Sequence, residues 1–376
     1  MEILFWICVV LVVYPYAIYP AVLVLCNRLL RRRAHRVSGE FVPTISIILP
    51  VHNEATRVAR KIENILELDY PRAKLQVLVI GDGCTDDSLE RAAEAGRDVV
   101  VTVPLAARGG KAAALNAGLE RASGEIIVFT DAGIILEHQS LRALVEHFED
   151  SQVGCVSGED YIEGAETEGL YGRLELLLRR EEALLHSIAG ASGCFYAQRR
   201  ELCEPFRAGM APDFLSVLNT VRKGKRALAE PRARGSMTAT SSQRAEFTRK
   251  VRTFLRGITA LFGNVSLLNP FRYPAFSFIL LSHKLARWLA PMPMIGCLVT
   301  SFMLRQDPLY FGLFIVQIVL YGMSIVGMLS PALASRLNLV RLSTFFVLVN
   351  AAALKALGLW MAGQRLEVWQ PTQRPK

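Results

Sequence analysis

The fold of this chain is decided by three apolar runs that each lead into polar residues: TISIILPV (residues 44–51), LQVLVIGDG (75–83) and EIIVFTDAG (125–133). Each run is short and almost continuously apolar, which is typical of a strand buried on both faces of a sheet. Between the first two runs, Glu54–Leu68 carries apolar residues on one helical face and charges on the other. The alternation predicts an α/β domain with right-handed crossovers and a largely parallel sheet.

The same alternation continues along the chain. Further elements are expected as a helix at 86–94, a strand at 98–103, a helix at 111–121, a helix at 141–148, a strand at 153–157 and an amphipathic helix at 170–186. A turn-rich region is expected from Gly190 to about Glu230, with a helix that includes Leu215 and Leu218. A basic, amphipathic helix at 243–261 is typical of a helix that lies in a membrane interface.

Composition indicates membrane segments on both sides of this domain. Hydrophobic residues make up 52% of the 376 residues. The apolar segment 3–26 is longer than the core of a signal peptide and lacks a cleavage signature, so it is interpreted as a retained anchor. The expected organisation is an anchor at 1–27, a catalytic-type α/β domain at 40–242, interface helices at 243–274, membrane helices at 275–363 (with segments at 275–303, 309–330 and 341–363) and a tail at 364–376.

Charge predicts the orientation and excludes one class of partner. The formal net charge is +9, and arginines gather directly after the first apolar segment: Arg28, Arg31, Arg32, Arg33 and Arg36. The positive-inside rule places residue 36 onward in the cytoplasm, hence a multi-pass protein of the cell membrane that contacts membrane lipids. Three C-terminal spans would put the C-terminus outside, whereas Arg365, Arg374 and Lys376 favour the inside, so its side stays open. No nucleic-acid partner is expected because no binding motif appears.

The seven cysteines are scattered without paired spacing, which indicates reduced thiols in a protein that faces the cytosol.

In a parallel sheet the ligand binds at the carboxyl ends of the strands, where His52–Glu54, Asp82 and Asp131 all fall. The carboxylate of Asp82 could accept hydrogen bonds from a uracil imide or ribose hydroxyls, with Gly83 allowing close approach. The alternative is an ordinary turn before a helix.

Arg108-Gly109-Gly110-Lys111 forms a glycine loop before a helix, which suits an anion site, although a solvated turn is an equal alternative. Asp131 ends a very apolar strand, and a buried carboxylate there needs a partner such as a divalent cation bound to a diphosphate. A turn-capping role is the alternative for Asp131. From the residues alone Asp213 is better interpreted as a helix N-cap than as a base. Arg249, Lys250 and Arg252 could clamp a diphosphate or face lipid headgroups.

Together these residues resemble family 2 glycosyltransferases, of the membrane-anchored polysaccharide-synthase type related to hyaluronan, cellulose and poly-N-acetylglucosamine synthases. The resemblance covers about residues 40–260. Its motifs are Pro50–Glu54, Gly81–Asp86, Gly110–Asn116, Phe129–Ala132, Gly190–Gly193, Pro212–Phe214 and Phe247–Arg252.

The resemblance implies a GT-A (Rossmann-like) domain inserted between transmembrane helices. It implies inverting transfer from a UDP-sugar, with Mg²⁺ or Mn²⁺, to a polysaccharide or lipid-linked acceptor in cell-surface or exopolysaccharide synthesis. The implied roles are uridine binding by Asp82, nucleotide contact by Lys111, metal and diphosphate binding by Asp131, general-base catalysis by Asp213, and diphosphate contact by Arg249 and Arg252. Glu54, in the first motif, joins the nucleotide-sugar-binding set.

Three departures from the family pattern stand out. The family's Asp-any-Asp motif is Asp131-Ala132-Gly133 here, so the second acidic ligand is missing. Pro212 stands where an acidic residue is common. The Gln-any-any-Arg-Trp motif of processive synthases is Arg249-Lys-Val-Arg-Thr253, and the loss of Trp favours the addition of one or a few sugars.

Two other functions are compatible with the sequence. One is a non-catalytic membrane scaffold, a pseudo-glycosyltransferase that kept nucleotide binding. The other is a lipid-phosphate monosaccharide transferase. The sugar, the acceptor and the linkage stay open, and the few membrane segments make a partner subunit or a homo-oligomer conceivable.

Overall fold

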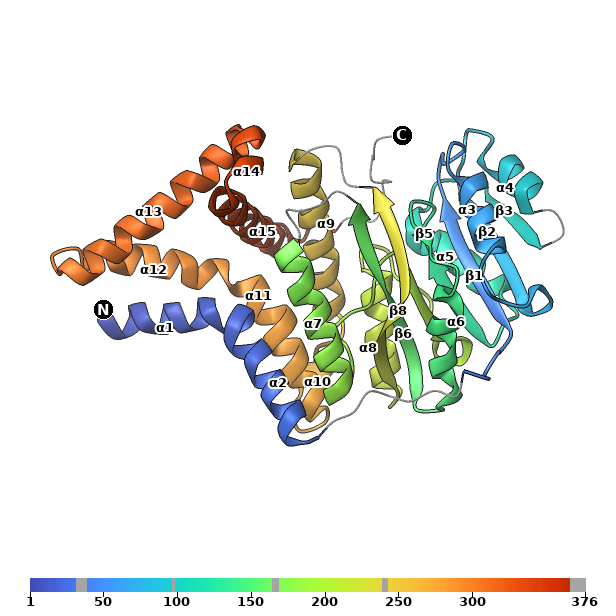
Figure 1. The fold of residues 1–376 in the computed structure, drawn as a ribbon, viewed down its shortest axis with the longest axis horizontal. Coiled ribbons are helices and arrows are strands. Elements are labelled where there is room, and N and C mark those ends of the chain that lie inside the picture. Colours follow the sequence, from blue (N-terminus) through green and yellow to red (C-terminus); the bar gives the residue numbers. More distant parts are fainter. Residues whose placement is uncertain (32–38, 97–98, 164–168, 239–242, 366–376) are drawn as a thin grey trace.

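The structure, a computed structural model, describes residues 1–31, 39–96, 99–163, 169–238 and 243–365. An α/β domain lies at one end of the molecule and a group of long apolar helices at the other (Figure 1). Helices α7 (Gly169–Leu185) and α9 (Gln243–Phe262) lie between these two parts. Most of the Arg cluster after the first helix (Arg32, Arg33, Arg36) and the tail residues Arg374 and Lys376 lie outside the described residues.

The described strands form one sheet in the order β3-β2-β1-β4-β7-β6-β8-β5. Their bounds are β1 Ile45–Val51, β2 Leu75–Asp82, β3 Val100–Leu105, β4 Ile126–Thr130, β5 Ile135–Leu136, β6 Val153–Glu163, β7 Phe195–Arg199 and β8 Arg226–Thr238. Strands β3, β2, β1 and β4 are mutually parallel, so their carboxyl ends meet at one edge. β7 pairs antiparallel with β4 and β6, whereas β6 and β8 are parallel.

The predicted strands are present, but the sheet is mixed rather than largely parallel. The region predicted to be turn-rich contains β7 and the first part of β8, Arg226–Glu230, and that prediction was wrong. β8 escaped detection because several of its buried positions are filled by small residues such as Ala227, Ala233 and Gly235, which carry little strand signal. Asp98, expected to begin β3, lies outside the described residues.

Two apolar cores cover the two faces of the sheet. The helices of the domain are α3 Val58–Leu66, α4 Ser88–Gly96, α5 Gly110–Arg121, α6 Ser140–Val145 and α8 Pro212–Arg222. Ile47 and Leu49 of β1 pack in the core formed with α3, α4 and α6, while Ile48 packs in the core formed with α5 and α8. This alternation is the reason that β1 is apolar throughout. The helix predicted to begin at Glu54 begins only at Val58, because residues 54–57 form a turn.

The apolar helices match the predicted membrane segments. They are α1 Glu2–Val13 and α2 Tyr19–Leu29, joined by a π-helical turn at Tyr14–Ile18, then α10 Pro274–Ile279, a π-helical segment Leu280–Leu285, α11 Ala286–Leu289, α12 Pro291–Met303, α13 Pro308–Leu329, α14 Pro331–Arg336 and α15 Asn338–Met361. Within the described residues, three helices are long and apolar enough to cross a membrane: Glu2–Leu29, Pro308–Leu329 and Asn338–Met361. The pair Pro274–Leu289 and Pro291–Met303, bent by 51°, would make a fourth.

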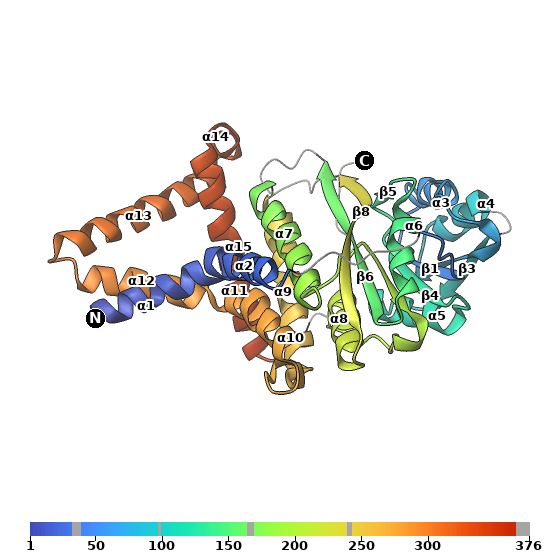
Figure 2. The same ribbon diagram turned by 60° about the horizontal axis from the view of Figure 1, so that its bottom comes forward.

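Helix α9 joins the two parts of the molecule. Val251, Leu255 and Ile258 on its apolar face belong to the same buried core as Leu215 of α8 and Ala352 of α15. The apolar face predicted to lie in a membrane interface therefore packs against protein on both sides. Helix α9 lies at the boundary between the α/β domain and the apolar helices (Figure 2), and its basic residues therefore belong to this boundary.

Candidate active site

Asp82, at the carboxyl end of β2, holds the loop that leads into α5. Its side chain is fully buried, and Oδ1 accepts hydrogen bonds from the backbone N–H groups of Gly109 (2.7 Å) and Gly110 (3.0 Å). Gly110 has φ +80°, a conformation that favours glycine. The backbone at Arg108 lies so close to Gly83 that a Cβ on Gly83 would be 2.8 Å from the Arg108 nitrogen. The two predicted motifs thus meet in space.

Lys111 and Asp131 form an ion pair at the carboxyl edge of the sheet. Nζ of Lys111 lies 2.6 Å from Oδ1 of Asp131 and also donates to the carbonyl oxygen of Gly193, 3.1 Å away. Lys111 is in the first turn of α5, and Asp131 directly follows β4. The loop before α5 is held by Asp82, so the position of the Lys111 backbone depends on that buried carboxylate.

Asp213 lies across from this pair, in the first turn of α8. The N-cap of α8 is Ala211, so the interpretation of Asp213 as the N-cap was wrong. A Cβ on Gly193 would be 3.9 Å from Cγ of Asp213, which places the residues 190–193 loop between Lys111 and Asp213. Burial raises the pKa of the Asp213 carboxyl above its ordinary 3.8, although the cations Lys111, Lys284 and Arg256 oppose that shift.

The basic residues of α9 line the same space. Arg249, Lys250 and Arg252 are all in the wall of a cavity of about 410 Å³ that also contains Lys111, Asp131 and Asp213. The three residues therefore face the same space as the predicted donor-site residues. Arg249 donates to Glu246 on the same helix at 2.6 Å and 2.7 Å, which holds its guanidinium near the cavity.

Two predicted residues lie outside the wall of this cavity. Glu54 contacts Arg57, with Nη1 of Arg57 3.7 Å from Oε2 of Glu54, and its backbone N–H donates to Ser88 at 2.8 Å. Asp82 is likewise absent from the wall. Both follow neighbouring strands at their carboxyl ends. Asp82 adjoins the cavity through the loop before α5 that it holds, whereas Glu54 contacts the start of α3 and of α4.

The sequence interpretation missed several polar residues of the cavity. Arg256 of α9, one turn after Arg252, is 8% exposed, and its Nε and Nη2 atoms have no hydrogen-bond partner among the described residues. Lys284 lies with Nζ 5.6 Å from the ring centroid of Phe214, and Asp160 comes from β6. The spacing of Arg249, Arg252 and Arg256 along one helical face was the signal for Arg256. Lys284 lies in the segment 275–303, which the sequence predicts as a membrane segment and not as part of the site.

The donor set suits a divalent cation held by a single carboxylate. Mg²⁺ is commonly bound through one or two carboxylates together with substrate phosphates. Asp131 supplies one carboxylate, and a Cβ on Gly133 would meet no atom within 4 Å, so the position of the missing second acid is open space. The residues therefore fit an ion that takes its remaining ligands from a diphosphate and water, with Lys111 competing for Asp131.

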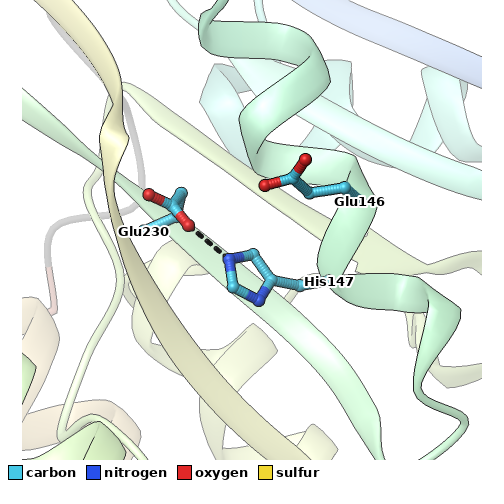
Figure 3. A group of neighbouring side chains, drawn as sticks. All are labelled: Glu146, His147 and Glu230. Atoms are coloured by element: carbon cyan, nitrogen blue, oxygen red, sulfur yellow. Dashed lines mark hydrogen bonds and ion pairs between the residues drawn. The ribbon is translucent and has the colours of Figure 1, made fainter. Parts of the chain in front are cut away.

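A different acidic cluster lies elsewhere in the domain. Within the described part of the chain, one group of three His, Cys, Asp or Glu residues has its ligand atoms within 4.8 Å of one another: Glu146, His147 and Glu230 (Figure 3). His147 pairs with Glu230, and Arg232 pairs with both carboxylates. Burial alone would raise the pKa of Glu230, but hydrogen bonds from His147 and Arg232 lower it to about 2. Arg232 and His147 already partner these carboxylates, and none of the residues lines the cavity.

The chain is similar to known glycosyltransferases. Residues 46–206 match the family described as Glycosyl transferase family 2. The probable glycosyltransferase YdaM of Bacillus subtilis (strain 168) is 28% identical over 124 residues, which cover 31% of this chain and 30% of that protein. Poly-beta-1,6-N-acetyl-D-glucosamine synthase of Staphylococcus epidermidis is 27% identical over 179 residues, which cover 45% of this chain and 42% of that protein. The chain therefore spans less than half the length of each of these relatives.

One solved structure is similar over nearly the whole chain. It is the mannosyltransferase PcManGT from Pyrobaculum calidifontis in complex with GDP-Man and Mn²⁺, with a TM-score of 0.75 and 22% sequence identity. The alignment covers 96% of this chain and 100% of that one. At this identity the likeness concerns the fold, and the predicted GT-A fold with apolar helices at both ends is confirmed.

Proposed function

We propose, from the premise that the chain contains a glycosyltransferase family 2 domain, that it transfers a sugar from a UDP-sugar to an acceptor hydroxyl with inversion at the anomeric carbon. The observation that carries this proposal is the convergence of Lys111, Asp131 and Asp213 on one cavity. They come from α5, the end of β4 and the start of α8. A cation, a metal-type carboxylate and a base-type carboxylate are the three groups that such a transfer requires.

The donor is bound at the carboxyl edge of the sheet. Asp82 and Glu54 belong to the nucleotide end of this edge: Asp82 acts by holding the loop before α5 through the Gly109 and Gly110 amides, and Glu54 follows the neighbouring strand β1. The ammonium of Lys111 and the guanidinium groups of Arg249 and Arg252 hold the diphosphate by charge-assisted hydrogen bonds. Asp131 is the residue that would hold Mg²⁺ or Mn²⁺. When bound, such an ion supplies positive charge that stabilises the departing diphosphate.

The acceptor hydroxyl is activated by Asp213. As the acceptor oxygen bonds to the anomeric carbon, the bond from that carbon to the diphosphate oxygen breaks, UDP leaves, and the hydroxyl proton passes to the Asp213 carboxylate. A raised pKa suits this role because a base is most effective when its pKa lies nearer the working pH. One carboxylate on the acceptor side is sufficient for an inverting displacement.

The protein acts at the cell membrane, with the α/β domain in the cytoplasm. Support comes from the helices that are long and apolar enough to span a bilayer at both ends of the described chain. Thr253, the residue in place of the Trp of processive synthases, lines the cavity. A threonine offers no stacking surface to a sugar ring, which favours the addition of one or a few sugars to a polysaccharide or lipid-linked acceptor over continuous polymerisation.

The experiment that tests this function is the release of UDP from a panel of UDP-sugars by the full chain in detergent or vesicles. Asp213→Asn is expected to lower the rate by about 10²- to 10⁴-fold, the usual contribution of a general base. Asp131→Ala is expected to lower it as well. Asp87→Asn, an exposed aspartate paired with Arg91 on α4, serves as the matched control. Undiminished UDP release by both active-site variants would refute the assignment, and UDP binding without any turnover would favour the scaffold alternative.

A further inference from the structure

A second cavity, of about 480 Å³, lies among the apolar helices. Its wall comes from α1, α12, α13 and α15, and includes Val13, Cys297, Leu320, Phe346 and Val347. Nearly all of its lining is hydrocarbon, the exceptions being the side chains of Gln317, Tyr321, Ser343 and the thiol of Cys297. The volume falls within the roughly 300 to 1,000 Å³ typical of sites that hold one small ligand. A cavity of this kind suits a hydrocarbon chain and rejects a sugar polymer.

The apolar cavity adjoins the active-site cavity at Tyr16. Tyr16 lines the active-site cavity, while Val13, one helical turn earlier, lines the apolar one. On α15 the same change occurs between Phe346 and Asn350. The Tyr16 ring meets Phe346 edge-on at 5.3 Å between centroids, and its hydroxyl donates to Asn350 Oδ1 at 3.5 Å. These side chains form the boundary between the charged active-site cavity and the apolar cavity. A molecule that occupies both cavities must therefore be amphiphilic.

The active-site cavity contains more cationic side chains than a donor diphosphate requires. Its wall contains eight lysines and arginines but only four aspartates and glutamates. Arg179 and Arg287 form ion pairs with Glu175, although each keeps at least one side-chain nitrogen without a hydrogen-bond partner. Arg256 is 8% exposed, keeps Nε and Nη2 without a hydrogen-bond partner, and has no carboxylate partner in the described structure. A buried guanidinium with unsatisfied donors is costly unless an anion binds it. Arg256 and Asp213 line the same cavity, so this anion site and the proposed base face one space.

We propose that the acceptor is a phosphate-linked lipid with a single long hydrocarbon chain. The chain occupies the apolar cavity between α1, α12, α13 and α15, the phosphate contacts Arg256 and Lys284, and a hydroxyl of the head group reaches Asp213. This inference rests on the proposed function and adds the acceptor class. Arg256 is the anion-binding residue on the acceptor side, and the arginines nearer the start of α9 serve the donor.

The test of the apolar cavity uses phosphate-linked sugar acceptors that differ only in chain length. Each methylene that enters the cavity is expected to lower the acceptor KM by about fourfold until the cavity is filled. Val347→Trp, which fills the cavity, is expected to remove this dependence on chain length and to leave the KM for the UDP-sugar unchanged. Val319→Trp is the matched control, because Val319 is 51% exposed on α13 and lies outside the cavity wall.

The test of the anion site compares lipids of equal chain length with and without the phosphate. Arg256→Gln is expected to abolish the preference for the phosphate-bearing lipid, and Arg256→Lys to keep most of it. Arg244→Gln, at an exposed position on the same helix, is the control. Equal use of charged and uncharged lipids by the wild-type protein would overturn this part of the inference, and so would better use of a two-chain phosphatidyl lipid.

Failure of this inference can be told from failure of the proposed function. UDP release with a short, soluble acceptor or with water reports the donor half of the reaction alone. If that release occurs and depends on Asp213 or Asp131, but chain length has no effect on the acceptor KM, the lipid acceptor is refuted and the glycosyltransferase stands. If no UDP-sugar is turned over with any acceptor, the proposed function itself is refuted.

Discussion

The ammonium of Lys111 lies 2.6 Å from Oδ1 of Asp131, and the same ammonium donates to the carbonyl oxygen of Gly193. Gly193 in turn lies against Asp213. One lysine therefore connects the strand end that would bind the diphosphate with the loop that adjoins the proposed base. A change in its charge should affect both halves of the reaction.

Replacement of this lysine by an uncharged side chain is the first prediction. Lys111→Met is expected to weaken UDP-sugar binding by about ten- to hundredfold, because hydrogen bonds that involve a charged group contribute roughly 1.5 to 3 kcal/mol. Isothermal titration with UDP measures the effect. Lys225→Met, in the turn between α8 and β8, should bind UDP like the wild type. Equal affinity in both variants would show that Lys111 serves only to hold Asp131.

The pH dependence of transfer should report the burial of Asp213. Its pKa is raised above the ordinary 3.8, and the base acts only when deprotonated, so activity is expected to fall as the pH drops through this raised value. Arg256 lowers the pKa of Asp213, and Arg256→Gln should therefore move the acidic limb of the kcat/KM profile to higher pH. If the acidic limb of the kcat/KM profile stays at the wild-type pH in this variant, Arg256 does not affect the protonation of Asp213.

Restoration of the missing acid is a third prediction. Gly133 has open space around its Cα and does not adopt a positive φ, so Gly133→Asp should fold without strain. A second carboxylate adds charge to the cation site, and the Mn²⁺ concentration for half-maximal activity is expected to fall by on the order of tenfold. Gly172→Asp, another glycine with no atom near its missing Cβ, is the control. An unchanged metal requirement would indicate that residue 133 points away from the diphosphate.

The buried cluster of Glu146, His147 and Glu230 should stabilise the domain in a pH-dependent manner. The folded-state pKa of Glu230 is about 2, below its ordinary 4.5. A depressed carboxyl pKa contributes stability that is fully present above the unfolded value and is lost as the pH falls from about 4.5 towards 2. Glu230→Gln is therefore expected to cost about 3 kcal/mol near neutral pH, in line with the loss of one partner of a buried ion pair.

Thermal unfolding of the wild type and of Glu230→Gln, followed at neutral pH and at about pH 3, measures this effect. The difference in Tm should shrink at the lower pH. Glu120→Gln, whose side chain is 76% exposed, is the control and should leave Tm unchanged at both values. A Tm difference that persists unchanged in acid would mean that packing rather than charge holds the cluster together.

The amino-acid sequence by itself determined the strands β1, β2 and β4, the polar residues at their carboxyl ends and the positions of the long apolar helices. These features depend on local patterns: a continuous apolar run, a glycine turn before a helix, and an apolar length sufficient to span a bilayer. Asp82, Lys111, Asp131 and Asp213 were named on that basis together with the resemblance, and the structure brings the last three to one cavity.

Only the tertiary structure decided that β7 and β8 complete a mixed sheet, that α9 packs between the α/β domain and α15, and that Arg256 is buried beside Asp213. Each of these depends on contacts between segments far apart in the chain, which no local pattern encodes. The apolar cavity is the clearest case. The residues of α1 and α15 that line it are indistinguishable in the sequence from other apolar positions of these helices, and only the packing of α1, α12, α13 and α15 leaves a space among them.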